Sequence, residues 1–301
     1  MSWSPADVSA VVVNYHAGGH LDACLASLRA AGVGERVVVD NGSAPGAAAG
    51  ARRTDPDLRW IDAGGNVGYG AAANRGAQET SRPLVLVCNP DVVVDAGAVE
   101  ALVARLAADP GLGLVGPLVR NPDGSVYPSA RTFPDLVDAL GHGALGLLAP
   151  GNRFTARYRM LDWDHARPAR VDWVSGACIL ARRTAWSDIG GFDPAYFMYL
   201  EDVDLCWRAW EAGWAVGYEP GATVTHVQGV SAGRHPYRML LAHHRSLWRF
   251  ARQTTAGSRR LVLPVVAVGL VGRFAVAVAA HRLSPGSARQ AIHRPVAGPV
   301  P

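Results

Sequence analysis

Apolar residues in the first third of the chain follow two alternating patterns. Continuous apolar runs rich in Val are typical of strands that are buried on both faces of a sheet; they lie at residues 9–14, 36–40, 58–62 and 83–88. Apolar positions with helical spacing lie at residues 20–31, 71–80 and 98–108. This alternation predicts an α/β fold, in which a mostly parallel central sheet is flanked by helices on both faces.

Polar residues follow three of the predicted strands. They are Asn14-Tyr15-His16, Asp40-Asn41-Gly42-Ser43 and Asn89-Pro90-Asp91. Asn, Asp, Gly and Pro also form ordinary turns, so a single polar strand end carries little information. Ligands of parallel sheets bind beyond the carboxyl ends of the strands, and three polar ends along one edge therefore favour a binding site there.

A glycine-rich stretch, residues 64–74, opens the second predicted helix. Gly68 to Ala73 fits the dinucleotide fingerprint G-x-G-x-x-A, with Asp91 close to the place of its ribose-binding acid. That fingerprint should follow the first strand, whereas strands with polar ends precede this loop, so a dinucleotide oxidoreductase is only an alternative. Glycine backbone at a helix N-terminus can bind a phosphate, with Asn66 and Asn74 as additional donors, or can simply form a tight turn.

Charged residues are divided unevenly along the chain. Residues 1–219 hold 18 Arg and all 25 acidic residues, whereas residues 220–301 hold 11 Arg and no acidic residue; Lys is absent. A basic segment without acids indicates an anionic partner, either nucleic acid or a membrane surface. Its arginines are not interleaved with aromatic residues as in a nucleic-acid module, and we expect no nucleic-acid partner.

Residues 261–280 are almost entirely apolar and reach the roughly 20 residues that a membrane span requires. Pro264 and Arg273 weaken the interpretation as a span. The flanking arginines favour an interfacial element on anionic lipid, ahead of a soluble helix packed on the body and of a true span. We therefore divide the chain into a catalytic domain of residues 1–235 and a basic helical tail of residues 236–301.

Composition limits the class of protein further. The apolar fraction of 49% is too high for a disordered chain. Four cysteines lie far apart and form no C-x-x-C pair, so we expect neither a disulfide scaffold nor a zinc site, and a reducing compartment fits. The N-terminal residues lack the charged and apolar regions of a secretory signal.

The motifs together resemble those of the family 2 glycosyltransferases, nucleotide-sugar enzymes with the GT-A fold. Their order and spacing match over residues 8–235. The residues that carry the resemblance are Val11 to Tyr15, Asp40 to Ser43, Gly65 to Gly68 with Asn74, Asn89 to Asp91, Gly190 to Asp193 and Phe197 to Leu205. The resemblance implies attack by a sugar hydroxyl on an anomeric carbon, from which a nucleoside diphosphate leaves.

A narrower resemblance is to bacterial rhamnosyltransferases, on residues 116–131. The stretch is similar to actinobacterial enzymes that add L-rhamnose to N-acetylglucosaminyl-diphospho-polyprenol, in the linker between peptidoglycan and arabinogalactan. This implies an inverting enzyme that uses dTDP-L-rhamnose and works peripherally, at the cytoplasmic face of the plasma membrane. The alternatives are another hexosyltransferase with a galactofuranosyl or mannosyl donor, an oxidoreductase, and a non-catalytic protein of the membrane surface.

The resemblance assigns the chemistry to carboxylates. Asp202 is the candidate general base, preferred over Glu201 and Asp204, although carboxylates in a first helical turn also simply favour the helix dipole. Asp91 is the candidate ligand of Mg²⁺ or Mn²⁺, in a D-x-D motif whose first acid is replaced by Asn89. His226 is the candidate second ligand or a diphosphate contact, although a lone His is commonly structural.

The remaining candidates line the donor and the acceptor. Asp40 should recognise the donor base or ribose, and the donor set comprises Asn14, Tyr15, Asp40, Asn41, Gly65, Asn66, Gly68, Asn74, Asn89 and Asp91. The acceptor set comprises Asp172, Trp173, Ser175, Gly176 and Glu201. Trp173 can stack on a sugar or pack in the core. Contacts to the diphosphate of a lipid-linked acceptor are assigned to Arg234, His243 and Arg245.

Overall fold

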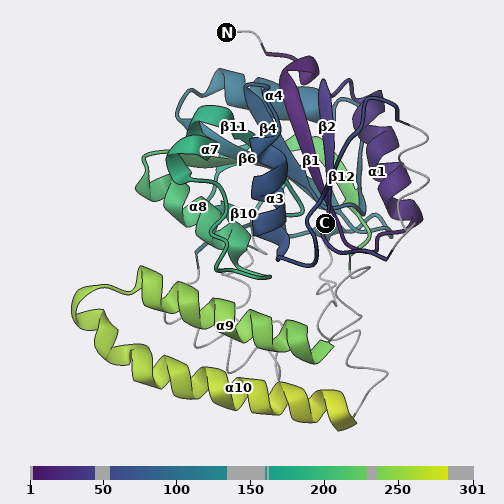
Figure 1. The fold of residues 1–301 in the computed structure, drawn as a ribbon. Coiled ribbons are helices and arrows are strands. Elements are labelled where there is room, and N and C mark those ends of the chain that lie inside the picture. The colour runs from purple at the N-terminus through teal and green to yellow at the C-terminus, as the bar shows by residue number, and fades with distance from the viewer. Residues whose placement is uncertain (1–2, 45–54, 134–159, 161–162, 229–235, 284–301) are drawn as a thin grey trace.

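A twisted mixed sheet forms the centre of the protein in the computed structural model, which describes residues 3–44, 55–133, 160, 163–228 and 236–283 (Figure 1). The strands along the sheet have the order β3-β2-β1-β4-β11-β6-β12-β5. Their bounds are β1 Val8–Asn14, β2 Glu35–Asp40, β3 Arg59–Asp62, β4 Leu84–Cys88, β5 Val92–Val94, β6 Leu112–Arg120, β11 Cys178–Arg182 and β12 Ala215–His226. The shorter strands are β7 Val126–Tyr127, which pairs with β6, and β9 Ala169–Arg170, which pairs with β12.

Strand direction divides this sheet into a parallel part and a mixed part. β1, β2, β3 and β4 pair in parallel, and β12 is parallel to β6. β11 runs antiparallel to both of its neighbours, and β5 runs antiparallel to β12. The predicted α/β fold with a mostly parallel sheet is thus confirmed. A separate small sheet pairs β8 (Ala130–Arg131) with β10 (Trp173–Val174).

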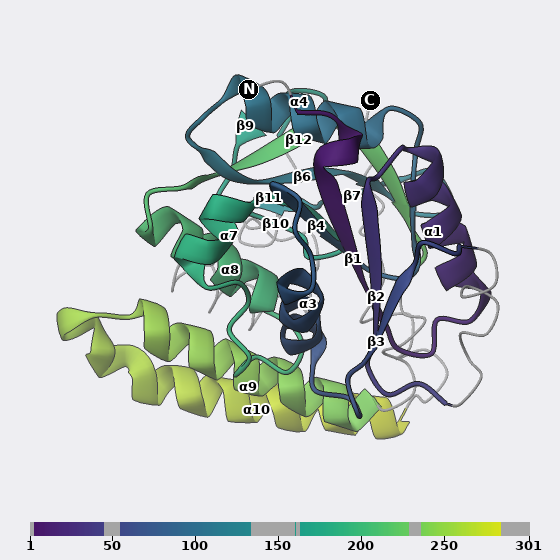
Figure 2. The same ribbon diagram turned by 45° about the horizontal axis from the view of Figure 1, so that its top comes forward.

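Helices cover both faces of the large sheet (Figures 1 and 2). α1 (Gly19–Ala30) and α4 (Ala98–Ala108) share one apolar core with one face. On the other face, α3 (Tyr69–Gln78), α7 (Arg183–Ile189) and α8 (Glu201–Glu211) share a second core. A 3₁₀ turn, η1 (Pro5–Asp7), precedes β1.

The β1 run shows why the apolar segments identified in the sequence form central strands. Every residue of Val8–Asn14 is buried, with Val side chains alternating between the two cores, as a strand with helices on both faces requires. α3 approaches this strand closely because Gly76 has no side chain. A Cβ there would lie only 2.3 Å from Cγ1 of Val11.

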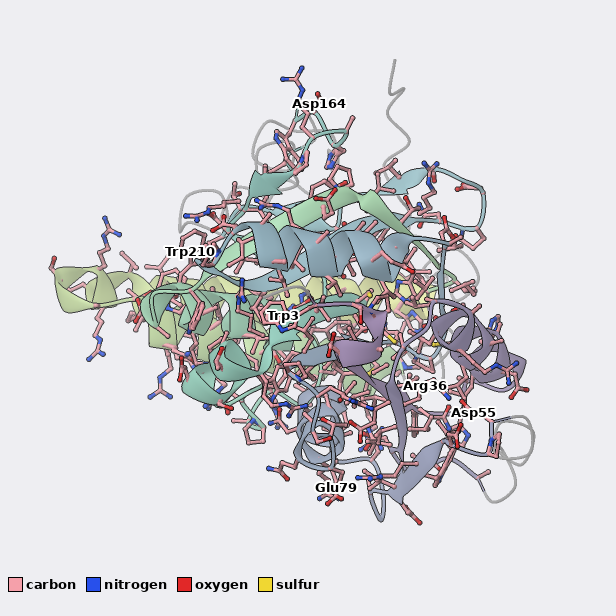
Figure 3. All side chains as sticks on the ribbon, turned by 90° about the horizontal axis from the view of Figure 1, so that it is seen from above. Trp3, Arg36, Asp55, Glu79, Asp164 and Trp210 are labelled. Carbon is pink, nitrogen blue, oxygen red and sulfur yellow. The ribbon has the colours of Figure 1, made fainter. Side chains whose placement is uncertain are left out.

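An ion pair stabilises the end of the sheet near β2. The Arg36 guanidinium donates to both carboxylate oxygens of Asp55, at 2.7 and 3.0 Å, and both side chains are buried (Figure 3). Arg36 also donates to the carbonyl of Val33 at 2.7 Å. The guanidinium thus joins the start of β2 to the loop that leads to β3. Its hydrogen bond with Asp55, opposed by burial, lowers the pKa of that carboxyl.

A helical hairpin follows the α/β unit. α9 (Pro236–Thr254) packs against the α8 side of the domain, and α10 (Leu263–Leu283) packs on α9, with the 3₁₀ segment η3 (Gly257–Val262) between them (Figure 1). In the described part of the chain, Gly257–Leu283 is the one helical stretch long and apolar enough to cross a membrane, judged by length and composition. The four cysteines are free and buried.

Candidate functional site

The first two polar strand ends lie against each other at the carboxyl edge of the sheet. The parallel register of β1 and β2 places Asn14 opposite Asp40. The Asn14 amide donates to Oδ1 of Asp40 at 3.2 Å and to the Ser43 hydroxyl at 3.1 Å, and the N–H of Ser43 also donates to Oδ1 of Asp40, at 3.2 Å. Tyr15 follows directly and is half-buried. Three predicted donor residues therefore lie together, with Asp40 fixed by its neighbours.

Asn41 joins this edge to the glycine loop. Its side-chain amide donates to the carbonyl of Gly68 at 3.3 Å and to Oδ1 of Asn66 at 3.2 Å, and its Oδ1 accepts from the N–H of Val67 at 2.9 Å. The contact is close: a Cβ on Gly42, whose φ is +89°, would lie 2.8 Å from the backbone N of Asn66. Asn41 is therefore a structural link between the second strand end and the loop.

The glycine loop ends against the segment that leads into α8. The N–H of Tyr69 donates to the carbonyl of Phe197 at 3.1 Å. Gly68 has a φ of +93°, and a Cβ there would lie 2.7 Å from that same carbonyl oxygen. Glycine is thus required at position 68 by both backbone conformation and space. Gly65 has open space around it, which leaves its backbone accessible.

Asn74, assigned to the donor by resemblance, makes a different contact. Its amide donates to the carbonyl of Phe192 at 2.7 Å, and its Oδ1 accepts from the N–H of Phe192 at 2.9 Å. Both polar atoms of the side chain therefore bind the backbone of the loop after α7. This contact explains a polar residue inside α3, and donor binding by Asn74 stays a prediction.

The buried Asp91 and the half-buried His226 form a pair at the third polar strand end. The antiparallel register of β5 and β12 places His226 opposite Val92, next to Asp91. Nε2 of His226 lies 3.2 Å from Oδ1 of Asp91 and 3.1 Å from the amide nitrogen of Asn89. The structure thus brings together the three residues that the resemblance assigned to the metal and its motif.

The donor set of this pair fits a divalent ion that is only partly held by protein. It offers one carboxylate and one imidazole, and within the described residues no group of three or more His, Cys, Asp and Glu side chains is arranged for a metal. Mg²⁺ commonly keeps waters and binds through one or two carboxylates together with substrate phosphates. A site of so few protein ligands is therefore compatible with an ion that arrives with a diphosphate.

A short loop after β10 joins the Asp91 region to Asp202. The N–H of Asn89 donates to the carbonyl of Ala177 at 2.9 Å. The N–H of the preceding residue, Gly176, donates to Oδ2 of Asp202 at 2.8 Å, and its carbonyl accepts from the hydroxyl of Tyr69 at 2.9 Å. One backbone segment thus holds the β4 end, the first turn of α3 and the predicted base.

Glu201 and Asp202 open α8 in an environment that disfavours charge. Burial and the adjacent Asp202 carboxylate raise the pKa of Glu201 to about 8, and its buried Oε2 has no hydrogen-bond partner within the part of the chain that the structure describes. Burial also raises the pKa of Asp202, against hydrogen bonds from the N–H groups of Gly176 and Val203. The Asp202 charge is one cause of the rise at Glu201, so ionisation of Asp202 favours the protonated form of Glu201.

The backbone before these two carboxyls is strained. Tyr199 and Leu200 have φ values of 68° and 62°, in the left-handed region that non-glycine residues seldom occupy. Such conformations cost on the order of 1–3 kcal/mol each and concentrate at functional sites. The surrounding contacts that hold them include the ring of His243, 5.3 Å from that of Tyr199. His243 of α9 is thus placed beside residues 199–201, the Glu201 segment.

The predicted acceptor loop is divided between surface and core. Asp172 accepts a hydrogen bond from the N–H of Phe133, and Ser175 pairs with the backbone of Ser129. Trp173 is only 4% exposed, and its indole N–H donates to the carbonyl of Thr132 at 2.9 Å. Its ring is therefore packed in the core, and the expectation that it stacks on a sugar is not supported, because no broad ring face reaches the surface.

The last predicted contacts lie on or before α9. Arg245 is exposed on that helix, and Arg234 lies outside the described residues.

The sequence offered no role for Arg131, which lies within the stretch that resembles rhamnosyltransferases. Its guanidinium lies over the rings of Tyr127 and Trp173, at 5.4 and 5.0 Å from their centroids, and its charge lowers the pKa of Asp202. It is therefore a site residue that the resemblance contained but did not single out.

Comparison with known proteins agrees with this geometry. Residues 5–260 match the family described as glycosyltransferase-like family 2. The chain belongs to this family. The match extends through α9. A mannosyltransferase from Pyrobaculum calidifontis, solved with GDP-Man and Mn²⁺, shares the fold with a TM-score of 0.57 and 17% identity, over 98% of this chain and 84% of that one. The predicted GT-A fold is thereby confirmed.

Two of the relatives in sequence are named as glycosyltransferases. An N-acetylglucosaminyl-diphospho-decaprenol L-rhamnosyltransferase of Mycobacterium tuberculosis is 42% identical over 264 residues, which cover 82% of this chain and 84% of the relative. A low-salt glycan biosynthesis hexosyltransferase, Agl10, of Haloferax volcanii is 27% identical over 76% of this chain and 69% of its own. The family 2 membership predicted from the motifs is confirmed, and so is the similarity to rhamnosyltransferases.

Proposed function

We propose that this family 2 protein is an inverting rhamnosyltransferase. It transfers L-rhamnose from dTDP-L-rhamnose to N-acetylglucosamine carried on a polyprenyl diphosphate, a step of cell-wall linker synthesis. The observation that carries the choice of donor and acceptor is the 42% identity to the mycobacterial rhamnosyltransferase, which extends over most of both chains. The arrangement of Asp202 and Glu201 supports the chemistry.

In this proposal Asp202 is the general base. Its carboxylate takes the proton from the acceptor hydroxyl, whose oxygen attacks the anomeric carbon of rhamnose while the bond to the diphosphate oxygen breaks. A single displacement inverts the anomeric configuration. The raised pKa of Asp202 suits this role because it brings the basicity of the carboxylate closer to the working pH.

Glu201 acts as an uncharged partner of the base. Its buried Oε2 has no hydrogen-bond partner among the described residues, a costly arrangement unless a ligand satisfies it. The protonated carboxyl can donate to an acceptor oxygen and orient the hydroxyl toward Asp202. Two neighbouring carboxyls in different environments thus divide orientation and proton transfer between them.

The donor binds at the carboxyl edge of the parallel strands. Asp40, held by Asn14 and Ser43, recognises the nucleoside, and the ring of Tyr15 lines the same region. The backbone of the glycine loop, from Gly65 to the start of α3, faces the diphosphate, where the helix dipole favours negative charge. Asn66, at the exposed end of the loop, adds an amide.

Asp91 and His226 are the residues that would hold Mg²⁺ or Mn²⁺, with Asn89 beside them. The ion would offset the charge of the leaving diphosphate. The chain itself contributes a preformed pair of ligands after β4, and the neighbouring Asn89 is bonded through Ala177 to the loop that holds Asp202. The acceptor is lipid-linked, so the protein works peripherally at the cytoplasmic face of the membrane, with His243 and Arg245 toward the acceptor diphosphate.

A donor screen with purified full-length protein tests the proposal. The assay measures transfer to a polyprenyl-diphosphate N-acetylglucosamine acceptor from dTDP-L-rhamnose, UDP-galactofuranose and GDP-mannose, each with and without EDTA. We expect turnover with the thymidine donor and its loss in EDTA, restored by added Mg²⁺ or Mn²⁺. Turnover with a uridine or guanosine donor and none with dTDP-L-rhamnose would assign the protein to another hexosyltransferase. Full activity in EDTA would contradict only the proposed role of the ion, and the proposed donor and acceptor would stand.

A further inference from the structure

α10 is apolar from Pro264 to Ala280 except for Arg273. From Pro264 to Ala280 every exposed residue is apolar or Gly, and the large side chains are far from buried: Val265 is 62%, Val268 73%, Val271 70% and Val276 57% exposed. A continuous apolar stripe of this length on a water-soluble surface indicates a site of contact with another apolar phase. Because α10 packs on α9, these exposed residues lie on the side of α10 that α9 does not cover.

The polar group in the middle of α10 lies on its other face. Arg273 is half-buried on the side of α9, as is Phe274, whose ring lies 5.3 Å from that of His244. Burial, with a smaller contribution from the Arg273 charge, lowers the pKa of His244. The arginine that weakens a transmembrane interpretation of the sequence is therefore not among the exposed residues, and it leaves the outward stripe uninterrupted.

α9 fixes the orientation of the hairpin because it is bound to the catalytic domain by side chains. Arg249 forms an ion pair of 2.6 Å with Asp193, and the Gln253 amide donates to Asp204 at 2.7 Å. Phe250 is buried in the core on the α8 side of the sheet. α10 thus runs along the base of the domain, with α9 between them (Figures 1 and 2).

This arrangement is incompatible with α10 crossing a bilayer. A spanning α10 would carry α9, and the domain to which α9 is bound, into the hydrocarbon, where the polar groups of both would lose their water. An α10 that lies along the membrane surface buries only its outward stripe. Interfacial helices typically enter the boundary of headgroups and acyl chains by about 5–10 Å, and we expect this depth for the stripe.

The charge around the stripe selects lipid over a second copy of the chain. Exposed arginines border the hairpin at positions 238, 245, 252, 259, 260 and 282, and no acidic residue follows Glu219. A second copy docked through the same stripe would bring two basic, acid-free hairpins together, which repel each other. Anionic headgroups instead attract basic residues near the membrane surface.

We propose that α10 lies in the plane of an anionic membrane, with its Val265–Val276 side embedded and its arginines in the headgroup layer. α9 then separates the lipid from the catalytic domain by one helix layer, about 10 Å. His243 and the Glu201 segment are held near the height of a lipid diphosphate and its sugar. This last consequence rests on the proposed function, whereas the docking of α10 on lipid does not.

Vesicle binding by the full-length protein, without donor or acceptor, tests the surface. We expect it to bind vesicles that contain phosphatidylglycerol and to bind phosphatidylcholine vesicles weakly, with binding reduced by salt. Val268→Asp, in the centre of the stripe, should weaken binding by about tenfold or more, since it replaces an apolar side chain that enters the lipid with a charged one. Ala104→Asp adds the same charge at an exposed position of α4 and should bind as the parent does.

A depth measurement distinguishes the plane from the span. Val265 and Val276 lie on the same exposed side of α10 and are separated by about 16 Å of helix rise. The native cysteines are buried, so Val265→Cys and Val276→Cys can each be labelled with a fluorophore and quenched by lipids spin-labelled at known depths. We expect the same shallow depth for both labels.

Three results would overturn the proposal. They are labels whose depths differ by on the order of the helix rise, vesicle binding by Val268→Asp equal to that of the parent, and a stable dimer in lipid-free solution that Val268→Asp dissociates. The first would make α10 a span, and the last would assign the stripe to a second copy. Because no sugar is present in these measurements, failure of the donor screen leaves them unaffected.

Discussion

The backbone N–H of Gly176 donates a hydrogen bond of 2.8 Å to Oδ2 of Asp202, in a loop whose next residue is bonded to Asn89. A hydrogen bond to a carboxylate stabilises its charged form, so this contact keeps the carboxyl ionisable despite the burial that raises its pKa. It also fixes the orientation of the carboxylate. The position of the proposed base is thus set by backbone that also supports the proposed metal site.

Asp202→Asn should abolish most turnover and leave donor binding intact. The amide keeps the shape of the side chain but cannot accept the acceptor proton, and loss of a general base commonly lowers the rate by about 10²–10⁴-fold. Transfer assays give kcat, and calorimetry with dTDP gives donor affinity. Asp164→Asn, at an exposed position remote from this loop, is the control and should retain parental activity. Near-normal turnover in Asp202→Asn would exclude it as the base.

Gly176→Ala should lower kcat through a small displacement of Asp202. A Cβ at position 176 would lie 3.1 Å from Cβ of Asp202 and 3.4 Å from its Oδ2, so the carboxylate must move by a few tenths of an ångström. We expect a loss of about tenfold to 10²-fold in kcat with little change in donor KM, because catalysis is sensitive to small misplacement. Gly19→Ala is the matched control, since a Cβ there meets open space. Equal kinetics for the two variants would show that this contact does not position the base.

Arg131→Met should shift the pH dependence of catalysis. The Arg131 charge lowers the pKa of Asp202, while burial, the larger effect, raises it. Removal of the charge therefore raises the pKa of the base in the free enzyme, and the acid limb of the kcat/KM profile should move to higher pH. Arg131→Lys keeps the charge and should retain the parental limb. A loss of activity without any shift of the limb would indicate that Arg131 acts only through its packing on Trp173.

The strands of the parallel half were predictable because β1, β2 and β4 are buried on both faces, which demands continuous apolar runs that chance seldom produces. The helix predicted over residues 71–80 begins earlier, at Tyr69. The N–H of Tyr69 donates to the carbonyl of Phe197, and the sequence could not show this contact because Phe197 lies far along the chain. The reversed direction of β11 was not predictable either, since strand direction depends on the path of the connections rather than on the side chains.

Within the candidate site, the motifs predicted which residues lie near one another better than which groups each side chain contacts. Asn14 and Asp40 are neighbours because parallel register follows from two matched apolar runs. The sequence could not show that both polar atoms of Asn74 bind Phe192, or that Trp173 is buried, because each depends on a residue brought near only by folding. The unpartnered oxygen of Glu201 likewise arises from tertiary burial.

Asp91→Asn and His226→Asn should weaken divalent ion binding independently of turnover. Each change removes one of the two proposed protein ligands, and with so few ligands either loss should raise the Kd for Mn²⁺ in the presence of dTDP by about tenfold or more. Calorimetry or the electron paramagnetic resonance signal of free Mn²⁺ measures the Kd. Asp95→Asn, a few residues after Asp91 on the exposed surface, is the control. Parental Mn²⁺ affinity in both variants would place the ion elsewhere.

Asp55→Asn should destabilise the fold in a manner that depends on pH. Asp55 has a lowered pKa because of its hydrogen bond with Arg36, so its contribution to stability is complete above the pKa of about 3.9 in the unfolded chain and is lost as the pH falls through the lower, folded value. At pH 7 the variant leaves the buried Arg36 without its carboxylate, which we expect to cost about 3 kcal/mol. Urea denaturation should show this difference at pH 7 and a smaller one at pH 3.

The neighbouring Asp57 is exposed, and Asp57→Asn should change stability by less than about 0.5 kcal/mol. A difference for Asp55→Asn that is the same at both pH values would mean that packing around residue 55, rather than the ion pair, stabilises this end of the sheet.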